Sequence, residues 1–360
     1  DGSIMITGSH NPSNYNGFKM MVGGKSIHGN EILRLANYNI NSPSHKGKVK
    51  NFKIEDSYII EITKDIESIN QNLKVVWDAG NGATGNVIKK ILKLLPGKHF
   101  LLNSDIDGTF PNHHPDPTDE KNLKQLKDKV LKVHADLGIA FDGDGDRIGI
   151  VDNAGNPISG DKLFYIFALE VIKENPGATI ISDVKASNKV FSEIKKVGGN
   201  PLMWKTGHSF IKEKMRQTKA LLAGEMSGHI FFADKYYGYD DALYSSIRLL
   251  KILSKNKIIK KLLKPFSKLI STPEIKVFCE DNIKFDIMKR CKAEILKKYH
   301  DVDTIDGVRV NNKDGWWLIR ASNTQPALII RCEADNKLNL NKLILEVKNL
   351  LDKFNIKNNL

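Results

Sequence analysis

The sequence predicts an α/β protein of several domains, in which mixed, layered α/β domains are followed by a C-terminal domain of the α+β class. The first observation is an alternation of short apolar runs and helical segments through residues 56–268, which is typical of strands packed between helices. The second is a change near residue 269, after which three apolar runs lie close together between two helices. A length of 360 residues has room for two to three domains at roughly 150 residues each.

Four blocks divide the chain, with predicted boundaries at 1–55, 56–156, 157–268 and 269–360. Each expected strand is a short apolar run bounded by turn residues, and each expected helix carries apolar residues at a spacing of three to four. The expected strands are 3–7, 18–22, 73–77, 137–141, 148–151, 179–183, 202–205, 220–223, 274–279, 304–310, 315–320 and 327–333. The expected helices are 31–38, 57–69, 87–94, 120–132, 163–173, 189–196, 210–217, 241–253, 285–298 and 340–354.

The charge balance narrows the possible partners. The chain has 55 lysines and arginines against 42 acids, a formal net charge of +13, but most of the cations are lysines spread along the chain. Proteins that recognise the bases of DNA or RNA favour arginine, so we do not expect nucleic acid as a partner. We expect instead a pocket for anionic substrates. Cys279, Cys291 and Cys332 are scattered, which is typical of reduced thiols in a cytoplasmic protein.

Membrane attachment is also not expected. No run of about 18 uncharged apolar residues is present, and the first residues show no basic region followed by an apolar stretch of the kind found in signal peptides. The segment 251–269 holds seven lysines and no acid, which could form a basic amphipathic helix on a membrane surface. A helix packed on one face between two domains is the interpretation we favour.

The acidic loop D-G-D-G-D-R carries the strongest local signal. Asp142, Asp144 and Asp146 alternate with glycine, so a tight turn can direct three carboxylates at one spot. Adjacent anions repel unless a cation lies among them, and oxygen ligands suit Mg²⁺. An EF-hand is excluded, because Arg147 stands where that loop needs glycine and apolar strands flank the segment. A metal-free aspartate turn is the alternative.

Four further loops carry polar residues between predicted elements. Ser9 and His10 follow the first strand, and a serine beside a histidine could act as a nucleophile, although such pairs are common in loops. Gly224–His229 suits paired sugar hydroxyls, with an ordinary turn as the alternative. Arg320–Pro326 offers backbone amides and a guanidinium for phosphate, or else is a plain hairpin. His208 could titrate near neutral pH, but a lone histidine is more often structural.

Taken in this order, the segments resemble the α-D-phosphohexomutase superfamily, and most closely its bacterial phosphomannomutase/phosphoglucomutase branch. The resemblance covers the whole chain, so it implies the multi-domain phosphohexomutase architecture. It rests on the motifs T-G-S-H-N-P-x-x-Y-N-G-F-K, P-N-H-H-P-D-P, D-G-D-G-D-R, K-T-G-H-S, G-E-M-S-G-H, S-T-P-E-I, D-G-V-R-V and R-A-S-N-T-x-P.

The resemblance implies a role for each matching position. Ser9 would be the phosphoserine and, with the three aspartates of the acidic loop, a ligand of Mg²⁺. Lys19 and His208 match positions implicated in proton transfer and substrate contact. The residues that would bind the sugar hydroxyls or the non-reacting phosphate are Glu225, Ser227, His229, Arg320, Ser322, Asn323 and Thr324. The residues that would line the site are His10, Arg147 and Lys185.

The implied reaction interconverts hexose 1-phosphate and hexose 6-phosphate, of mannose, glucose or both, through phosphoserine and a hexose 1,6-bisphosphate. Mg²⁺ is the implied metal, and the bisphosphate is both intermediate and activator. A cytoplasmic monomer that acts on small hexose phosphates is expected. The alternatives are a phosphoglucosamine mutase, a metal-dependent phosphatase that does not isomerise, and an inactive sugar-phosphate-binding module.

The sequence departs from the family pattern at its start, because it begins with Asp1 and about a hundred residues of the family's first domain are absent. The first domain is therefore expected to be incomplete. We expect the chain to be weakly active or inactive, because Ser9 would lack part of its supporting sheet.

Overall fold

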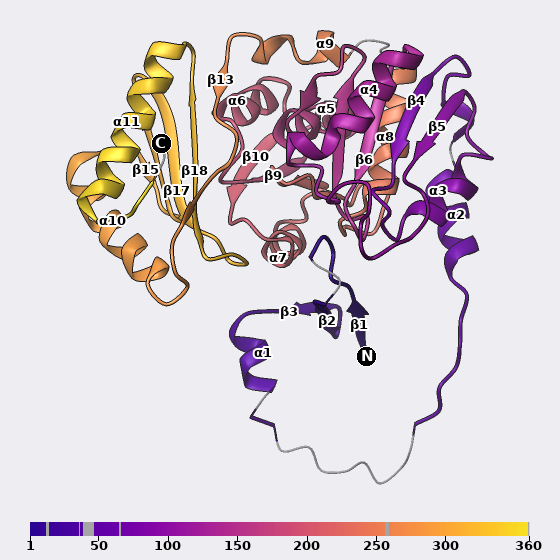
Figure 1. The fold of residues 1–360 in the computed structure, drawn as a ribbon, viewed down its shortest axis with the longest axis horizontal. Coiled ribbons are helices and arrows are strands. Elements are labelled where there is room, and N and C mark those ends of the chain that lie inside the picture. The colour runs from indigo at the N-terminus through magenta and orange to yellow at the C-terminus, as the bar shows by residue number, and fades with distance from the viewer. Residues whose placement is uncertain (12–13, 36, 39–46, 65, 256–258, 359) are drawn as a thin grey trace.

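The structure is a computed structural model that describes residues 1–360 apart from 12–13, 36, 39–46, 65, 256–258 and 359. Its described strands form four sheets, one in each successive stretch of chain. Three of the sheets lie in a row, and the small first sheet lies below them (Figure 1). The multi-domain α/β architecture predicted from the sequence is confirmed.

The first sheet is a three-stranded antiparallel meander of β1 (Gly2–Ile6), β2 (Phe18–Val22) and β3 (Lys25–Ile27), followed by the short helix α1 (Asn30–Leu35). The register pairs Met5 with Lys19. All five residues of β1 are exposed, so this sheet has almost no core of its own. Residues 7–11 connect it to the loops of the second sheet.

The second sheet has the strand order β5-β4-β6-β7-β8, with the first three strands parallel and the last two antiparallel. Its strands are β4 (Lys74–Asp78), β5 (Lys98–Leu102), β6 (Leu137–Phe141), β7 (Ile148–Asp152) and β8 (Pro157–Ile158). Its helices are α2 (Glu55–Thr63), η1 (Ile66–Ser68), α3 (Gly85–Ile91), η2 (Glu120–Leu123) and α4 (Lys124–Val133). The buried apolar residues of β4 and β6 pack on α4 from one face and on α3 from the other.

The third sheet has the order β10-β9-β11-β12, with the last strand antiparallel. Its strands are β9 (Thr179–Asp183), β10 (Asn200–Trp204), β11 (Leu222–Gly224) and β12 (Ile230–Phe232). Its helices are α5 (Gly160–Glu174), α6 (Asn188–Lys196), α7 (His208–Thr218), α8 (Ala242–Lys255), α9 (Ile259–Leu262) and η3 (Lys264–Phe266). One continuous hydrophobic core joins this layer to the second sheet, so the two are firmly packed together.

The C-terminal domain has an antiparallel sheet in the order β13-β18-β17-β16-β15, with β14 also paired to β18. Its strands are β13 (Ile270–Ser271), β14 (Ile275–Phe278), β15 (Val302–Asp303), β16 (Val308–Asn312), β17 (Gly315–Ala321) and β18 (Ala327–Ala334). Helices α10 (Lys284–Lys298) and α11 (Lys337–Lys353) cover one face, and Trp317 lies in the core between them. On the other face, Trp316 and Leu318 pack against Val184 of the third layer.

Several expected elements differ in the structure. The single strand expected at 304–310 is wrong, since a turn separates β15 from β16. Gly307 lies in that turn with φ +80°, and a Cβ there would meet the Ile319 carbonyl oxygen at 2.4 Å. The helix expected at 57–69 ends at Thr63. The sequence did not predict β3, β5, β8, β12 or β13, which are short or partly polar.

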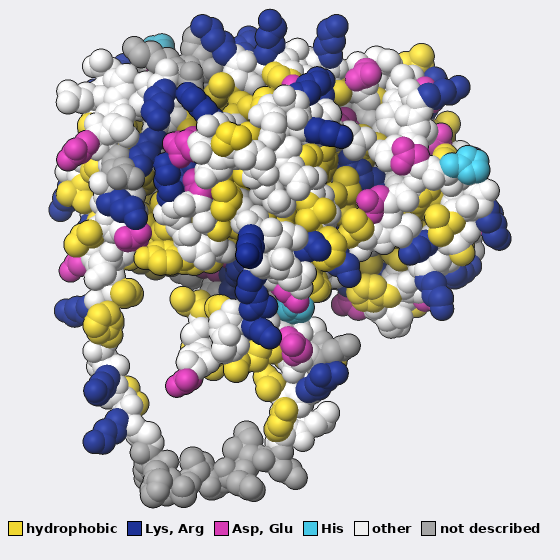
Figure 2. Space-filling model, turned by 180° about the vertical axis from the view of Figure 1, so that it is seen from behind, with side chains coloured by type: hydrophobic (Ala, Val, Ile, Leu, Met, Phe, Trp, Pro, Cys, Tyr) yellow, Lys and Arg dark blue, Asp and Glu magenta, His cyan; other side chains and the backbone are white. Residues whose placement is uncertain are grey.

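The described part of the basic segment 251–269 is not a single α-helix, because α9 ends at Leu262 and the 3₁₀ turn η3 follows it. Residues 256–258, between α8 and α9, lie outside the described part of the chain. Ile252, Ile259 and Phe266 are buried in the shared core, as a segment packed on one face would require. Figure 2 shows lysine and arginine side chains scattered over one face of the molecule. Across the described residues, the helices are too short or too polar to cross a membrane.

Candidate active site

The acidic loop joins β6 to β7, and its backbone folds around one of its own side chains. Asp142 Oδ1 accepts hydrogen bonds from the three backbone amides of 145–147, at 3.0, 3.1 and 3.1 Å. Gly145 has a φ of +79°, and a Cβ there would lie 2.3 Å from Thr84 Cγ2, so the turn requires glycine. The sequence therefore folds this loop into a tight turn.

Three carboxylates of the loop point into one volume. Oxygen atoms of Asp142, Asp144 and Asp146 lie within 4.8 Å of one another, and Asp144 Oδ1 is buried without a hydrogen-bond partner among the described residues. Burial raises the pKa of Asp142 well above its ordinary value, and the charges of Asp146 and Asp144 raise it further. Oxygen donors with this much negative charge fit a hard divalent cation, and so the loop fits Mg²⁺.

The Ser9 loop packs directly on the acidic loop. Ser9 Oγ donates to Asp142 Oδ2 at 2.8 Å and lies 3.0 Å from His10 Nδ1. The Ser9 amide donates to Thr7 Oγ1, and that hydroxyl donates to Asp144 Oδ2 at 2.7 Å. Ser9 has a φ of +51°, which non-glycine residues rarely adopt, so these contacts hold it in a strained conformation. The serine hydroxyl is thereby held beside the carboxylates that fit the metal.

Basic side chains border the same carboxylates. Lys19 Nζ, from β2, lies 3.1 Å from Asp144 Oδ2 and 2.6 Å from Asp146 Oδ2. Burial opposes the charge of Lys19, but the carboxylates outweigh burial and raise the pKa of this lysine. Burial, together with the charge of Arg147, lowers the pKa of His10 to about 4, so this imidazole is neutral at pH 7.

The turn between β11 and β12 carries Glu225, Ser227 and His229 and meets the acidic loop. His229 Nδ1 lies 2.7 Å from Glu225 Oε2, and its Nε2 lies 3.1 Å from Asp146 Oδ1. Arg147 Nε lies 3.1 Å from the same Nε2. Burial would lower the pKa of His229, but Asp146 and Glu225 outweigh burial and raise it to about 10. Burial would raise the pKa of Glu225, but the hydrogen bond and charge of His229 outweigh burial and lower this pKa to about 2. Ser227 is half-buried at the tip of the turn.

His208 begins α7 beside this turn, with its ring centroid 6.0 Å from that of His229. Its Nδ1 lies 3.9 Å from Asp240 Oδ2, which is too far for a hydrogen bond. Burial lowers the pKa of His208 to about 4 although Asp240 opposes this, so the imidazole is neutral at pH 7. The preceding amide, of Gly207, donates to Glu225 Oε1 at 2.5 Å and ties α7 to the turn.

The loop predicted to bind phosphate joins β17 to β18. Ser322 Oγ accepts hydrogen bonds from two backbone amides that follow it, at 3.3 and 3.1 Å, which wraps the loop around this hydroxyl. Asn323 and Thr324 are exposed at its tip. Arg320 Nε donates to Asp306 Oδ2 at 3.0 Å, while its Nη2 is buried without a partner among the described atoms.

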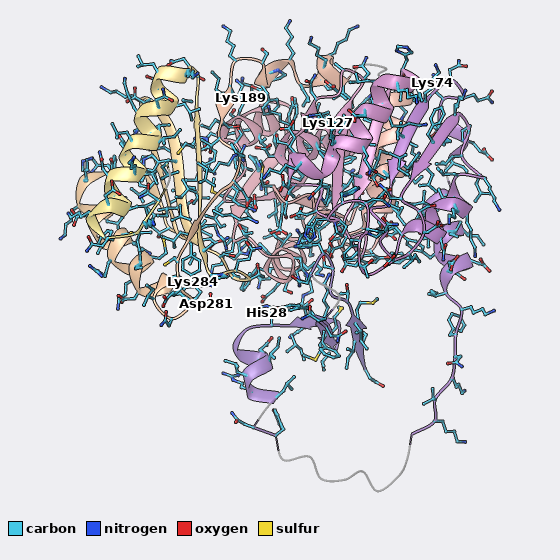
Figure 3. All side chains as sticks on the ribbon, viewed as in Figure 1. His28, Lys74, Lys127, Lys189, Asp281 and Lys284 are labelled. Carbon is cyan, nitrogen blue, oxygen red and sulfur yellow. The ribbon has the colours of Figure 1, made fainter. Side chains whose placement is uncertain are left out.

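The same loop is supported from the neighbouring helix. Lys284 Nζ donates to the Gln325 carbonyl oxygen at 3.0 Å and to Asp281 Oδ1 at 2.5 Å. Lys284 and Asp281 lie together at one end of the C-terminal domain (Figure 3). The base of the loop is therefore fixed while its tip stays exposed.

Lys185, expected to line the site, is buried among carboxylates between the third layer and the C-terminal domain. Its Nζ donates to Glu274 Oε2 at 2.6 Å and lies 3.6 Å from Asp183 Oδ2. Burial raises the pKa of Asp183 to about 6, although Lys185 lowers it. Lys185 is only 4% exposed, so in this arrangement it does not face open solvent.

Most of the predicted residues fall into two groups, while Lys185 lies apart beside Glu274 and Ser227 stands at the tip of its turn. The contacts above join Ser9, His10, Lys19, Asp142, Asp144, Asp146, Arg147, His208, Glu225 and His229. The phosphate-loop residues stand apart on the β17–β18 turn, and adjacent amides link them to the first group. The Thr206 amide donates to Asp306 Oδ2 at 3.0 Å, next to the Gly207 amide that holds Glu225.

Sequence reasoning missed five residues that shape the site, namely Thr7, Asp183, Asp240, Glu274 and Asp306. Three of them stood in quoted motifs but were given no role: Thr7 begins T-G-S-H-N-P, Glu274 belongs to S-T-P-E-I and Asp306 to D-G-V-R-V. Asp183 is the last residue of β9, a strand whose bounds the sequence predicted correctly. A polar residue at the carboxyl end of a parallel strand is a recognisable signal of a binding site.

Comparison with known proteins agrees with this geometry. Sequence models of the phosphoglucomutase/phosphomannomutase family match four successive stretches: domain I at 1–44, domain II at 56–155, domain III at 159–272 and the C-terminal domain at 274–350. A phosphomannomutase/phosphoglucomutase of Pseudomonas syringae is 46% identical over 94% of this chain and 74% of its own length. A phosphoglucomutase of Neisseria meningitidis is 41% identical over 97% of this chain and 77% of its own.

Solved structures give the same result. A family protein from Burkholderia thailandensis is 40% identical and superposes with a TM-score of 0.89, covering 100% of this chain and 78% of its own. An N-acetylphosphoglucosamine mutase from Aspergillus fumigatus, solved with GlcNAc-6P and magnesium, shares the fold at 14% identity and a TM-score of 0.68, covering 98% of this chain and 89% of its own. The chain belongs to the phosphoglucomutase/phosphomannomutase family of phosphohexomutases.

Proposed function

We propose that this phosphohexomutase moves a phosphoryl group between O1 and O6 of mannose or glucose phosphates, by way of Ser9 and a hexose 1,6-bisphosphate. One observation carries the proposal: Ser9 Oγ lies 2.8 Å from Asp142 in a cluster of three carboxylates that fits Mg²⁺. The relatives at 41–46% identity are named for the same chemistry.

Ser9 would carry the phosphoryl group. In the first transfer, the bond between phosphorus and Ser9 Oγ breaks, a bond to the free sugar hydroxyl forms, and the hydroxyl loses its proton to a base. Asp142, Asp144, Asp146 and a phosphoserine oxygen would hold the metal. Bound there, Mg²⁺ would offset negative charge that builds up on the transferring oxygens.

The basic residues around Ser9 would divide between charge and proton transfer. Lys19 keeps its proton because the carboxylates raise its pKa, and so it would act as a fixed cation beside the transferring group. His208 is neutral because burial lowers its pKa to about 4, and it can therefore accept a proton. His10 and Arg147 would orient the phosphoserine from the other side.

Substrate would be held at both ends. Glu225, Ser227 and His229 would bind sugar hydroxyls, and Lys185 would border that subsite once Glu274 releases it. The loop with Arg320, Ser322, Asn323 and Thr324 would bind the phosphate that is not reacting. Backbone amides and small hydroxyls at an exposed tip suit this task, because the same loop must accept a phosphate at O1 or at O6.

We further propose four domains with boundaries at 1–55, 56–156, 157–268 and 269–360, in a cytoplasmic monomer. The stretches matched by the four family models support these boundaries to within a few residues, apart from the end of the first. The bisphosphate as activator follows from the same reaction, since it can restore phosphate to Ser9.

Intact-mass measurement tests the phosphoserine directly. The protein, incubated with glucose 1,6-bisphosphate, should gain one phosphoryl group, and Ser9→Ala should gain none and lose isomerisation of mannose 1-phosphate followed by ³¹P NMR. Ser3→Ala, on the neighbouring strand β1, is the matched control and should behave as wild type. Phosphate release without isomerised product would instead favour a phosphatase, and an unmodified Ser9 would refute the proposal.

A further inference from the structure

The acidic loop is held in place by groups outside it as well as by its own hydrogen bonds. The Ala83 amide donates to the Gly143 carbonyl at 2.8 Å, and the Ala242 amide donates to the Gly145 carbonyl at 3.1 Å. Gly145 stands between two of the carboxylates that fit the metal, so a shift of its carbonyl changes the direction of both. Ala242 is the first residue of α8, so the start of that helix determines where this side of the loop lies.

Asp241 fixes the start of α8. Its Oδ1 accepts the amide of Tyr244 at 2.9 Å, which is the hydrogen bond of a helix N-cap. It also accepts two phenols from other parts of the chain: Tyr58 OH lies 3.0 Å from both carboxylate oxygens, and Tyr236 OH lies 2.7 Å from Oδ2. The carboxylate is only 6% exposed, so these donors replace water around a buried acid.

The phenols do more than capping requires. An N-cap needs one backbone amide, yet two tyrosines from separate elements converge on this carboxylate. Tyr58 belongs to α2 of the preceding layer, and its neighbour Ile59 packs in the core shared with α8. Tyr236 stacks on Tyr244 with ring planes 5° apart and centroids separated by 3.9 Å, which fixes the angle at which its hydroxyl approaches.

We propose that Asp241 is a positioning residue for the metal-binding loop. It accepts a hydrogen bond from Tyr58 of α2 and caps the helix whose first amide, that of Ala242, holds the Gly145 carbonyl. This inference rests on the proposed function, because it assumes that the acidic loop binds Mg²⁺. Asp241 acts through the backbone and touches neither metal nor substrate. Its role is to keep two carboxylates aimed at one point while the layers on either side remain packed together.

Tyr58→Phe tests the proposal with the smallest change, because it removes one hydroxyl and keeps the ring. Mn²⁺ binding, measured by electron paramagnetic resonance on the intact protein, is expected to weaken about threefold to tenfold, since outer partners of metal ligands commonly affect affinity at this scale or above. Asp241→Asn keeps a good N-cap but removes the charge, and it is expected to weaken binding at least as much. Tyr165→Phe, in the apolar core against Phe266, is the matched control.

The steady-state kinetics separate positioning from general destabilisation. The half-saturating Mg²⁺ concentration should rise in step with the Mn²⁺ dissociation constant, while KM for the sugar phosphate stays within twofold of wild type. Unchanged Mn²⁺ affinity in Tyr58→Phe refutes the proposal, even if Asp241→Asn fails to fold. Mn²⁺ binding does not need turnover, so a wild-type protein that binds Mn²⁺ but does not isomerise hexose phosphates would refute the proposed function and leave this test intact.

Discussion

Replacing Gly143 with alanine is expected to push Ser9 away from the acidic loop while the rest of the fold stays intact. A Cβ at this position would lie 1.9 Å from the Ser9 carbonyl oxygen, whereas real Cβ atoms keep at least 3.0 Å from such an atom. The two segments must therefore separate by about 1 Å. The acidic loop resists this shift, because its backbone amides are bonded to Asp142 and its Gly143 carbonyl to Ala83.

The Ser9 segment is the part that can move. It follows β1, whose five residues are all exposed. A displacement of about 1 Å in a reacting group lowers turnover by about 100-fold, so kcat should fall by roughly that factor. The free energy of unfolding should change by less than about 1 kcal/mol, because no core residue moves.

The assay compares kcat, KM and urea unfolding for Gly143→Ala with those of Gly108→Ala. Gly108 has open space where its Cβ would be, so its alanine variant controls for the loss of glycine flexibility. Mn²⁺ affinity is measured as well, because a loop that distorts instead of Ser9 would lose it. A Gly143→Ala protein with kcat within threefold of wild type would show that Gly143 does not pack closely against the Ser9 carbonyl oxygen.

Two predictions concern stability. Arg331→Met should lower the free energy of unfolding, measured in urea, by about 3–5 kcal/mol, because it leaves the carboxylate of Asp161 buried without the guanidinium that donates to it at 3.0 Å. Recovery of stability in the double variant Asp161→Leu/Arg331→Met would support this explanation. A decrease in the free energy of unfolding below about 1 kcal/mol in the single variant would contradict it. Burial lowers the pKa of His208 from 6.5 to about 4, so between these pH values the unfolded chain binds a proton that the folded chain does not. The contribution of this residue to the free energy of unfolding is complete above pH 6.5 and falls as the pH drops towards 4, by up to roughly 1.4 kcal/mol per pH unit. His208→Asn should remove that part of the slope of unfolding free energy against pH, measured by urea titrations at several pH values. Identical slopes in the two proteins would show that the imidazole is not buried in its neutral form.

The sequence predicted best where geometry is local. The strand at 137–141 agrees residue for residue with β6, because an unbroken apolar run bounded by polar residues leaves little choice of register. The tight turn of the acidic loop follows from similar local reasoning, since glycine at alternate positions allows the backbone to adopt the positive φ that such a turn uses. The contact of Ser9 with that loop came from the family resemblance, because 133 residues separate it from Asp142.

The sequence predicted least where two domains meet. Lys185 and Glu274 are 89 residues apart, and nothing in the pattern around either one indicates that they form an ion pair. Arg309, which stands in a quoted motif, is buried against the carbonyl oxygens of Val184 and Ala186 and stacks on Trp316. Such contacts depend on how complete sheets pack, and propensity and periodicity carry no information about that packing.

The two loops that would grip substrate are mechanically joined by consecutive amides. The Thr206 amide binds Asp306, which holds the phosphate-loop arginine, and the Gly207 amide binds Glu225 of the sugar loop. A sugar bisphosphate that reacts first at one end and then at the other needs an equal span between Ser9 and the distal phosphate in both orientations. Because neighbouring amides on one short segment hold both loops, the backbone between β10 and α7 sets the distance from the sugar loop to the phosphate loop, which is one part of that span.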